Sequence, residues 1–137
     1  MKVYLDTNVL LDVLLKREHF YEDSLAVLDL CENKQHQGWI NLVTIANIFY
    51  IGTKLVGKKE ARDIIEVLIS YLQVTGADKQ LVISALKLNF NDFEDALQYA
   101  SAYQTNGIHA IITRNNKDFK NSNLPVFSPA EFLNIGF

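Results

Sequence analysis

The sequence is poor in cysteine and proline and has no long apolar run. Cys31 is its single cysteine, so no internal disulfide can form and nothing favours secretion. No apolar stretch approaches the ~18 residues of a membrane span. Asp6 and Asp12 also interrupt the apolar N-terminal segment, as no signal peptide is interrupted. These features predict a cytoplasmic protein that does not enter a membrane.

Excess positive charge and histidine clusters are also lacking. The net charge is −3, so no overall basic field draws the chain to nucleic acid. This weakens any interpretation as a passive nucleic-acid binder, but it is compatible with an enzyme that has local lysine and arginine near an acidic centre. His19, His36 and His109 lie too far apart for metal-ligand spacing, which argues against a zinc site.

The sequence has no repeats, low-complexity tracts or linkers, and its 137 residues fit one domain spanning residues 1–137. Apolar runs alternate with amphipathic stretches along the chain. Strands are expected at residues 3–5, 38–42, 72–74, 109–113 and 126–128, and helices at 9–16, 21–33, 44–55, 58–72, 79–88, 92–105 and from Pro129 onward. This alternation predicts a three-layer α/β/α sandwich around a mostly parallel sheet, with a ligand crevice beyond the carboxyl ends of the strands.

Asp6 stands where the first predicted strand meets the first predicted helix. One interpretation is an acid that simply favours the helix dipole. Thr7 and Asn8 are both competent N-cap residues, however, so a third polar group is superfluous for capping. We therefore predict that Asp6 holds a ligand.

Further acids follow at or near the same predicted edge. Asp92 and Asp95 lie three residues apart on one side of a predicted helix, where Asp92 as N-cap would also approximate a capping box. Asp118 follows the fourth predicted strand and could equally cap a short turn. Glu94 should lie well round the helix and be solvated, and Asp12 is expected to be a structural acid or one that supports the site indirectly.

Taken together, these acids bring carboxylates from three distant segments to one end of one sheet. Gathering several carboxylates costs several kcal/mol of mutual repulsion unless a cation neutralises them. Oxygen ligands without histidine or thiol suit hard cations such as Mg²⁺ and Mn²⁺. Such a site favours phosphoryl chemistry, because the metal activates water and stabilises charge on a phosphodiester.

Three segments contain these acids: L-D-T-N-V-L-L-D (residues 5–12), D-F-E-D-A-L-Q-Y-A (92–100) and I-I-T-R-N-N-K-D-F (111–119). In this order they resemble the first, third and fourth motifs of the PIN-domain ribonucleases, a family that includes VapC-type toxins of toxin–antitoxin pairs. The match runs nearly end to end. The resemblance implies a PIN fold, a Mg²⁺- or Mn²⁺-dependent endoribonuclease, an RNA substrate, a small antitoxin partner and a homodimer.

The resemblance also implies roles for individual residues. Asp6, Asp95 and Asp118 would be the catalytic and metal-binding carboxylates, with Asp92 as a further candidate. The remaining candidates are polar residues that would orient these carboxylates or metal waters (Thr7, Asn8, Asn47, Thr113 and Asn115) and cations that would face a phosphate backbone (Arg114 and Lys117).

Asn47 is a departure from the family pattern. Many relatives carry a glutamate in the helix after the second strand, where this chain has T-I-A-N-I-F-Y (residues 44–50). Asparagine can coordinate a cation through its carbonyl oxygen but brings no charge, and it can also simply bond locally. The N-I-x-Y character is shared by a branch of the family. Asp92 is then the expected substitute charge.

Two alternatives remain. Asn47 motivates a catalytically weak PIN-like module that acts through protein or RNA binding. Phosphoaspartyl enzymes also place an aspartate after the first strand, but phosphatases of that kind require a second aspartate where this chain has Asn8. Residues 58–72 and the aromatic residues Phe20, Tyr21, Phe49 and Tyr50 could serve dimerisation or antitoxin docking, although we expect most of them to pack in the core.

Overall fold

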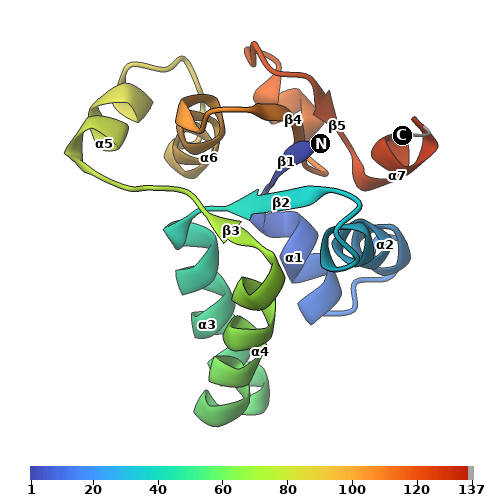
Figure 1. The fold of residues 1–137 in the computed structure, drawn as a ribbon. Coiled ribbons are helices and arrows are strands. Elements are labelled where there is room, and N and C mark those ends of the chain that lie inside the picture. The colour runs from blue at the N-terminus through green and yellow to red at the C-terminus, as the bar shows by residue number, and fades with distance from the viewer. Residues whose placement is uncertain (136–137) are drawn as a thin grey trace.

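The computed structural model describes residues 1–135; the last two residues of the predicted domain lie outside the described part. A five-stranded sheet in the order β3-β2-β1-β4-β5 forms its centre (Figure 1). The strands are β1 (Lys2–Leu5), β2 (Gln37–Ile40), β3 (Gln73–Val74), β4 (Ile108–Ile112) and β5 (Val126–Phe127). All four strand pairs are parallel, which confirms the predicted α/β class.

Helices cover both faces of this sheet and connect its strands. They are α1 (Thr7–Leu14), α2 (Tyr21–Glu32), α3 (Leu42–Val56), α4 (Lys58–Tyr71), α5 (Lys79–Leu86), α6 (Phe93–Gln104) and α7 (Pro129–Asn134), with a 3-10 helix η1 at Asn116–Phe119. In Figure 1, α5 and α6 lie on one side of the sheet and α1, α2 and α3 on the other, with α4 beside α3. Among residues 1–135, no helix combines the length and apolar character that crossing a bilayer requires.

Side chains of β1 alternate between two apolar clusters. Val3 and Leu5 pack with Ile40 on the α1–α2 side. Tyr4 packs with Tyr99 and other residues on the α6 side. This period of two is the geometry of an extended strand, and it buries β1 on both faces at the centre of the sheet.

Two predicted boundaries shift because polar residues cap helices earlier than expected. Helix α1 begins at Thr7, since Asp6 is its N-cap. Helix α3 begins at Leu42, because the Asn41 side chain accepts a hydrogen bond from the Thr44 N–H at 3.0 Å. The second strand therefore ends at Ile40, before the predicted residue 42.

The expectation that most of the candidate docking aromatics pack in the core is wrong for Phe20 and Tyr50, which are 42% and 63% exposed. Each ring instead lies beneath a cation. The Arg114 guanidinium is 4.0 Å from the Phe20 centroid, and the Lys54 ammonium is 4.2 Å from the Tyr50 centroid. Cation–π contact therefore gives both exposed rings a local partner.

Candidate functional site

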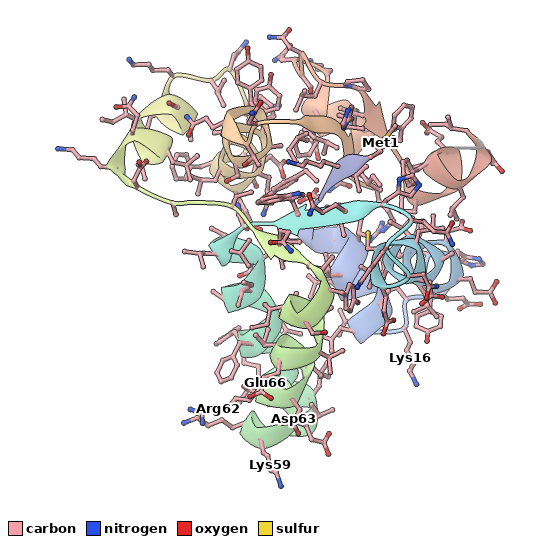
Figure 2. The ribbon with its side chains drawn as sticks, in the orientation of Figure 1. Met1, Lys16, Lys59, Arg62, Asp63 and Glu66 are labelled. Carbon is pink, nitrogen blue, oxygen red and sulfur yellow. The ribbon has the colours of Figure 1, made fainter. Side chains whose placement is uncertain are left out.

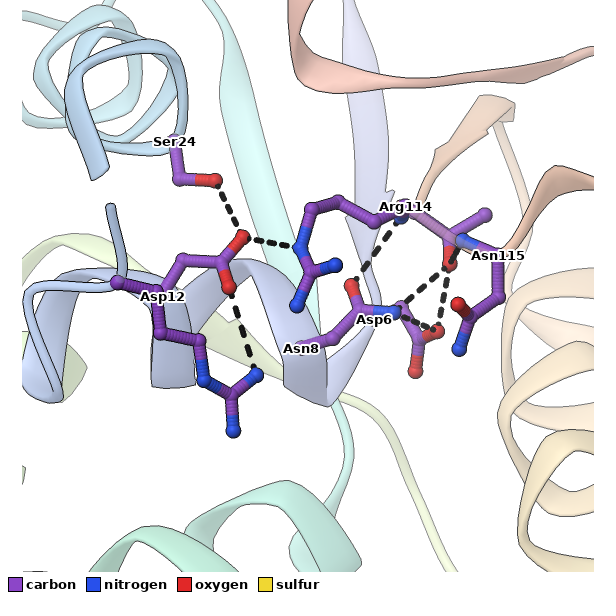
Figure 3. Close-up of polar contacts among 8 residues, drawn as sticks. Asp6, Asn8, Asp12, Ser24, Arg114 and Asn115 are labelled. Carbon is purple, nitrogen blue, oxygen red and sulfur yellow. Dashed lines mark hydrogen bonds and ion pairs between the residues drawn. The ribbon is translucent and has the colours of Figure 1, made fainter. Parts of the chain in front are cut away.

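Asp6 lies at the carboxyl end of β1 and has two roles at once. Its Oδ1 accepts the Thr7 N–H at 2.8 Å and so caps α1. Its Oδ2 accepts the Thr113 hydroxyl at 2.7 Å and the Asn8 side-chain N–H at 3.3 Å (Figure 3). The expectation that Thr7 or Asn8 would cap this helix is thus wrong, since the Asp6 carboxylate is the cap and the two neighbours use their side chains elsewhere.

The environment of Asp6 opposes its ionisation. The side chain is only 4% exposed. Burial raises the pKa of Asp6 to about 6, the hydrogen bonds from Thr113 and Thr7 act in the opposite direction, and the charges of Glu94 and Asp118 raise it further. The Asp6 carboxyl is therefore buried, and acids from two other segments further disfavour its ionisation.

Helix α6 brings the second set of acids to the site. Asp92 is its N-cap, with Oδ1 accepting the N–H of Glu94 at 2.7 Å and of Asp95 at 3.3 Å. Asp95 follows in the first turn and is half-buried. Burial raises the pKa of Asp95 to about 7, followed by the charges of Asp6, Asp92, Asp118 and Glu94. Capping therefore accounts for the position of Asp92, while Asp95 is the acid of α6 that responds most to Asp6.

Glu94 is exposed, which confirms the prediction that it is solvated, but it also belongs to the same acidic cluster. Its Oε1 accepts a hydrogen bond from the Asn47 side chain at 3.1 Å, although Glu94 stays exposed. Its charge raises the pKa of both Asp6 and Asp95. Helix α3 provides Asn47 beside the start of α6, and an amide donor there calls for an acceptor. That requirement is the sequence signal that could have identified Glu94.

The segment after β4 supports Asp6 from the other side. Thr113 is fully buried, and its hydroxyl accepts the backbone N–H of Asn115 at 3.0 Å and the Asn8 amide at 3.2 Å while it donates to Asp6. Asp118 follows in η1, where its N–H donates to the Asn115 carbonyl at 2.9 Å. Its side chain is exposed, so Asp118 reaches the site from the solvent side.

Arg114 faces away from Asp6, toward Asp12 (Figure 3). Its Nε donates to Asp12 Oδ2 at 2.6 Å, and the same oxygen accepts the Ser24 hydroxyl at 3.0 Å. Arg17 approaches the other oxygen of Asp12 at 3.4 Å. The positive charge of Arg114, which the sequence suggested would face a phosphate backbone, is here paired with a fully buried carboxylate.

A buried amide network joins the elements that contain the acids. Gln98, which has no exposed surface, donates through Nε2 to the hydroxyls of Thr7 at 2.9 Å and Thr44 at 3.3 Å. Its Oε1 accepts the hydroxyl of Tyr4. Gln98 lies one turn after Asp95, so the network fixes α6 against β1, α1 and α3.

The cluster has the donor chemistry of a hard-cation site but lacks tight convergence. Within residues 1–135, no three histidine, cysteine or acidic side chains are grouped closely enough to hold a metal ion as they stand. Burial nevertheless raises the pKa of Asp95, and the charges of Asp6, Asp92, Asp118 and Glu94 raise it further. All the donors are oxygens, which fits Mg²⁺ or Mn²⁺.

Asp95→Asn should stabilise the metal-free protein at high pH. The pKa values of Asp6 and Asp95 in the folded protein, about 6 and about 7, exceed the ordinary 3.8, so folding favours their protonated forms. The stability that these two protonated carboxyls contribute is fully present below pH 4, and it is lost as the pH rises through 6 and 7. In EDTA at pH 8 we expect the variant to melt about 1–4 °C above the wild type.

The same pair of proteins should melt at similar temperatures at pH 5, where Asp95 is already neutral in the wild type. Asp63→Asn, on α4 and far from the site (Figure 2), is the matched control and should show no pH-dependent gain. An equal gain for Asp95→Asn at pH 5 and pH 8 would contradict ionisation of the Asp95 carboxyl as its cause.

Comparison with known proteins places the chain in a family. A model of the PIN domain matches residues 2–117. Ribonuclease VapC1 of Aquifex aeolicus (strain VF5) is 32% identical over 141 residues, covering 96% of this chain and 92% of the relative.

Solved structures give the same fold. VapBC-1 from nontypeable Haemophilus influenzae matches with a TM-score of 0.69 at 18% identity, covering 95% of this chain and 99% of that one. VapBC2 from Rickettsia felis, bound to a DNA fragment from its promoter, matches with a TM-score of 0.67 at 19% identity, over 93% and 98% of the two chains. On the extent of the domain match and of the Aquifex alignment, the protein belongs to the PIN-domain family.

Proposed function

We propose that the protein is a Mg²⁺- or Mn²⁺-dependent endoribonuclease and the toxin of a toxin–antitoxin pair. The observation that carries the proposal is the placement of buried Asp6 near Asp95, Asp118 and Glu94, where burial first, and then the charges of these acids, hold the pKa values of Asp6 and Asp95 high. Neutralising such a cluster is what a divalent cation does. The 32% identity to a ribonuclease supports RNA as the substrate.

Each residue of the site has a distinct part in this proposal. Asp6, Asp95 and Asp118 would hold the cation, which when bound supplies charge neutralisation and activation of water. Thr113 and Asn8 each donate a hydrogen bond to the Asp6 carboxylate, and Asn8 also donates one to Thr113. These three hydrogen bonds fix the orientation of the carboxylate. Asn115 orients Thr113 in turn through its backbone N–H. Because Thr113 is buried and Asn8 is half-buried, the Asp6 oxygen is oriented before the ligand arrives.

The proposed protein partners are a small antitoxin and a second copy of this chain. The structural neighbours include VapBC complexes, which supports an antitoxin. Exposed apolar side chains also lie on α3 and α4, where a partner could cover them: Leu42, Tyr50, Leu55, Val67 and Ile69. We propose the cytoplasm as the location, in keeping with one buried cysteine, Cys31, whose thiol pKa is raised by burial to about 12.

A cleavage assay with a paired melting experiment tests the function. Purified protein should cut labelled RNA in Mn²⁺ or Mg²⁺ and should not cut it in EDTA. Mn²⁺ should also raise the melting temperature. At a concentration 100 times its dissociation constant, it should stabilise the folded protein by about 2.7 kcal/mol. Cleavage that persists in EDTA would contradict metal dependence.

The binding-module alternative has its own motivating observation, since Asn47 brings no charge and its amide is engaged by Glu94. Under that alternative Mn²⁺ should give neither a melting shift nor cleavage. A melting shift without cleavage would show a metal site that lacks the proposed activity.

A further inference from the structure

A polar groove runs beside the acidic cluster, between the segment that leads into α6 and the segment that contains η1. Its volume is about 500 Å³, and its walls include Asp92, Asp95 and Asp118. Two lysines, Lys117 and Lys120, line it as well. The groove therefore combines the proposed metal-binding acids with positive charge in one concave surface.

The two lysines are suited to contact consecutive anionic groups. They are three residues apart, Lys117 within the 3-10 helix η1 and Lys120 as its C-cap, and both line the groove. Both side chains are exposed, and within residues 1–135 neither forms an ion pair. Arg114, by contrast, is held by Asp12. Lys117 and Lys120 are thus the available cations beside the site, and Lys120 was not identified from the sequence.

The remaining walls offer groups that recognise unpaired bases. Asn89, Asn91 and Asn121 line the groove, and each side-chain amide can both donate and accept hydrogen bonds, as base edges require. The Asn121 Nδ2 donates to the Asn89 carbonyl at 2.8 Å and joins the two walls. Phe90 anchors the first wall by stacking on Tyr99 at 5.3 Å. The hydrogen bond therefore joins the two walls, and the stacked rings hold the first wall against α6.

Size and charge restrict the ligand. A volume of about 500 Å³ is that of a small-ligand site, which suits one or two nucleotides. Three carboxylates outnumber two lysines, so the groove repels an anion until a cation occupies the acidic cluster. Phosphate contacts at Lys117 and Lys120 should accordingly depend on the divalent metal.

We propose that this groove binds the single-stranded RNA segment adjacent to the scissile phosphate, with Lys117 and Lys120 contacting two phosphates and the asparagines contacting base edges. This inference rests on the proposed ribonuclease function and adds the location, strandedness and contacts of the substrate.

The test compares two double variants with the same change in charge. Lys117→Ala/Lys120→Ala removes the groove lysines, and Lys58→Ala/Lys59→Ala removes two lysines from the start of α4, where Lys59 lies far from the site (Figure 2). Either change takes the formal net charge from −3 to −5. Steady-state cleavage of a short single-stranded RNA is measured in Mn²⁺ at several monovalent salt concentrations.

We expect the groove variant to raise KM roughly tenfold with kcat nearly unchanged, because phosphate contacts bind substrate in the ground state as well. Its plot of log(kcat/KM) against log[salt] should be less steep by about 1.4, since each lost phosphate contact on a single strand removes about 0.7 from the slope. The α4 variant should keep the wild-type slope. A fully paired RNA should be cut at least about tenfold more slowly than the single strand.

The outcomes separate this inference from the function on which it rests. If the wild type does not cut RNA in Mn²⁺, the proposed function fails and the inference fails with it. If the wild type cuts RNA but the two double variants have equal KM values and equal salt slopes, only the groove assignment is overturned. Equal cutting of paired and unpaired RNA would overturn the single-strand assignment while leaving the ribonuclease intact.

Discussion

Asp6→Asn should abolish metal-dependent RNA cleavage, by at least about 10²–10³-fold, while leaving the fold intact. The substitution removes the negative charge of Asp6. This residue is 4% exposed and lies at the end of β1, near α6 and the segment after β4. Without that charge the proposed cation loses its most buried and best oriented ligand. The variant should also lose the Mn²⁺-dependent rise in melting temperature.

The fold should survive because asparagine preserves the helix cap. Its Oδ1 can accept the Thr7 N–H as the Asp6 Oδ1 does, and asparagine and aspartate are similar N-caps. The amide nitrogen would replace Oδ2, where the Thr113 hydroxyl already accepts from Asn8 and Asn115. That mismatch costs about 1 kcal/mol, and the relief of repulsion with the neighbouring acids offsets it.

Asp6→Ala provides the matched comparison. It removes the charge and the cap together, so it should be inactive and also less stable than Asp6→Asn by about 1 kcal/mol. Far-UV circular dichroism and thermal melts in EDTA distinguish the two effects. Wild-type cleavage by folded Asp6→Asn would exclude Asp6 from the proposed chemistry.

The sequence predicts the sheet and most helices well because their signals are local. Buried strands appear as short apolar runs, and the amphipathic period of residues 58–72 predicts α4 to within one residue. The placement of Asp95 near Asp6 follows from topology, because α6 leads back to the start of β4 and its own first turn therefore lies toward the edge where the parallel strands end. The resemblance to PIN domains, now established, added the order of the motifs.

The errors concern residues whose partners are distant in the sequence. Asp6 was predicted not to cap because Thr7 could, but Thr7 is drawn to Gln98 and Thr44 on other elements. Glu94 is exposed as its angle around α6 predicted, but that angle did not reveal that Asn47 of α3 lies within hydrogen-bond distance of it. Helix periodicity gives the direction of a side chain and not the position of the neighbouring element.

Arg114 illustrates the same limit for charges. A basic residue beside an acidic motif suggests contact with a phosphate backbone, and the sequence gives no sign that Asp12, in the first motif, lies within hydrogen-bond distance of it. The structure pairs the two at 2.6 Å. It leaves Lys117, together with Lys120, as the cation that faces the groove. Which positive charges are available is thus decided by tertiary pairing.

Asp12→Ala should be the most destabilising of the substitutions considered, lowering the free energy of unfolding by about 3 kcal/mol. Asp12 has no exposed surface and accepts hydrogen bonds from Arg114, Ser24 and Arg17. Its removal leaves the Arg114 guanidinium, which is 20% exposed, without its counter-ion. At a few degrees per kcal/mol, the melting temperature should fall on the order of 10 °C.

A double-mutant cycle with Arg114→Met identifies the pair as the cause. If the loss arises from an uncompensated buried charge, Asp12→Ala/Arg114→Met should be more stable than the sum of the two single changes, by about 1.5 kcal/mol or more. Additive effects would show that the two residues stabilise the fold independently. Chemical denaturation gives each free energy of unfolding, and constant slopes would confirm that the transition stays two-state.

The Mn²⁺ response of Asp12→Ala decides whether Asp12 acts on structure or on metal. Asp12 is linked to the site through Arg114, whose backbone N–H donates to Asn8 Oδ1 at 3.3 Å, and Asn8 in turn donates to Asp6. A structural acid predicts that Mn²⁺ still raises the melting temperature of folded Asp12→Ala by as much as in the wild type. Loss of that rise in Asp12→Ala, with the rise retained in Arg114→Met, would instead make Asp12 part of the metal site. Because the carboxylate is fully buried and both its oxygens face arginines, we expect the first outcome.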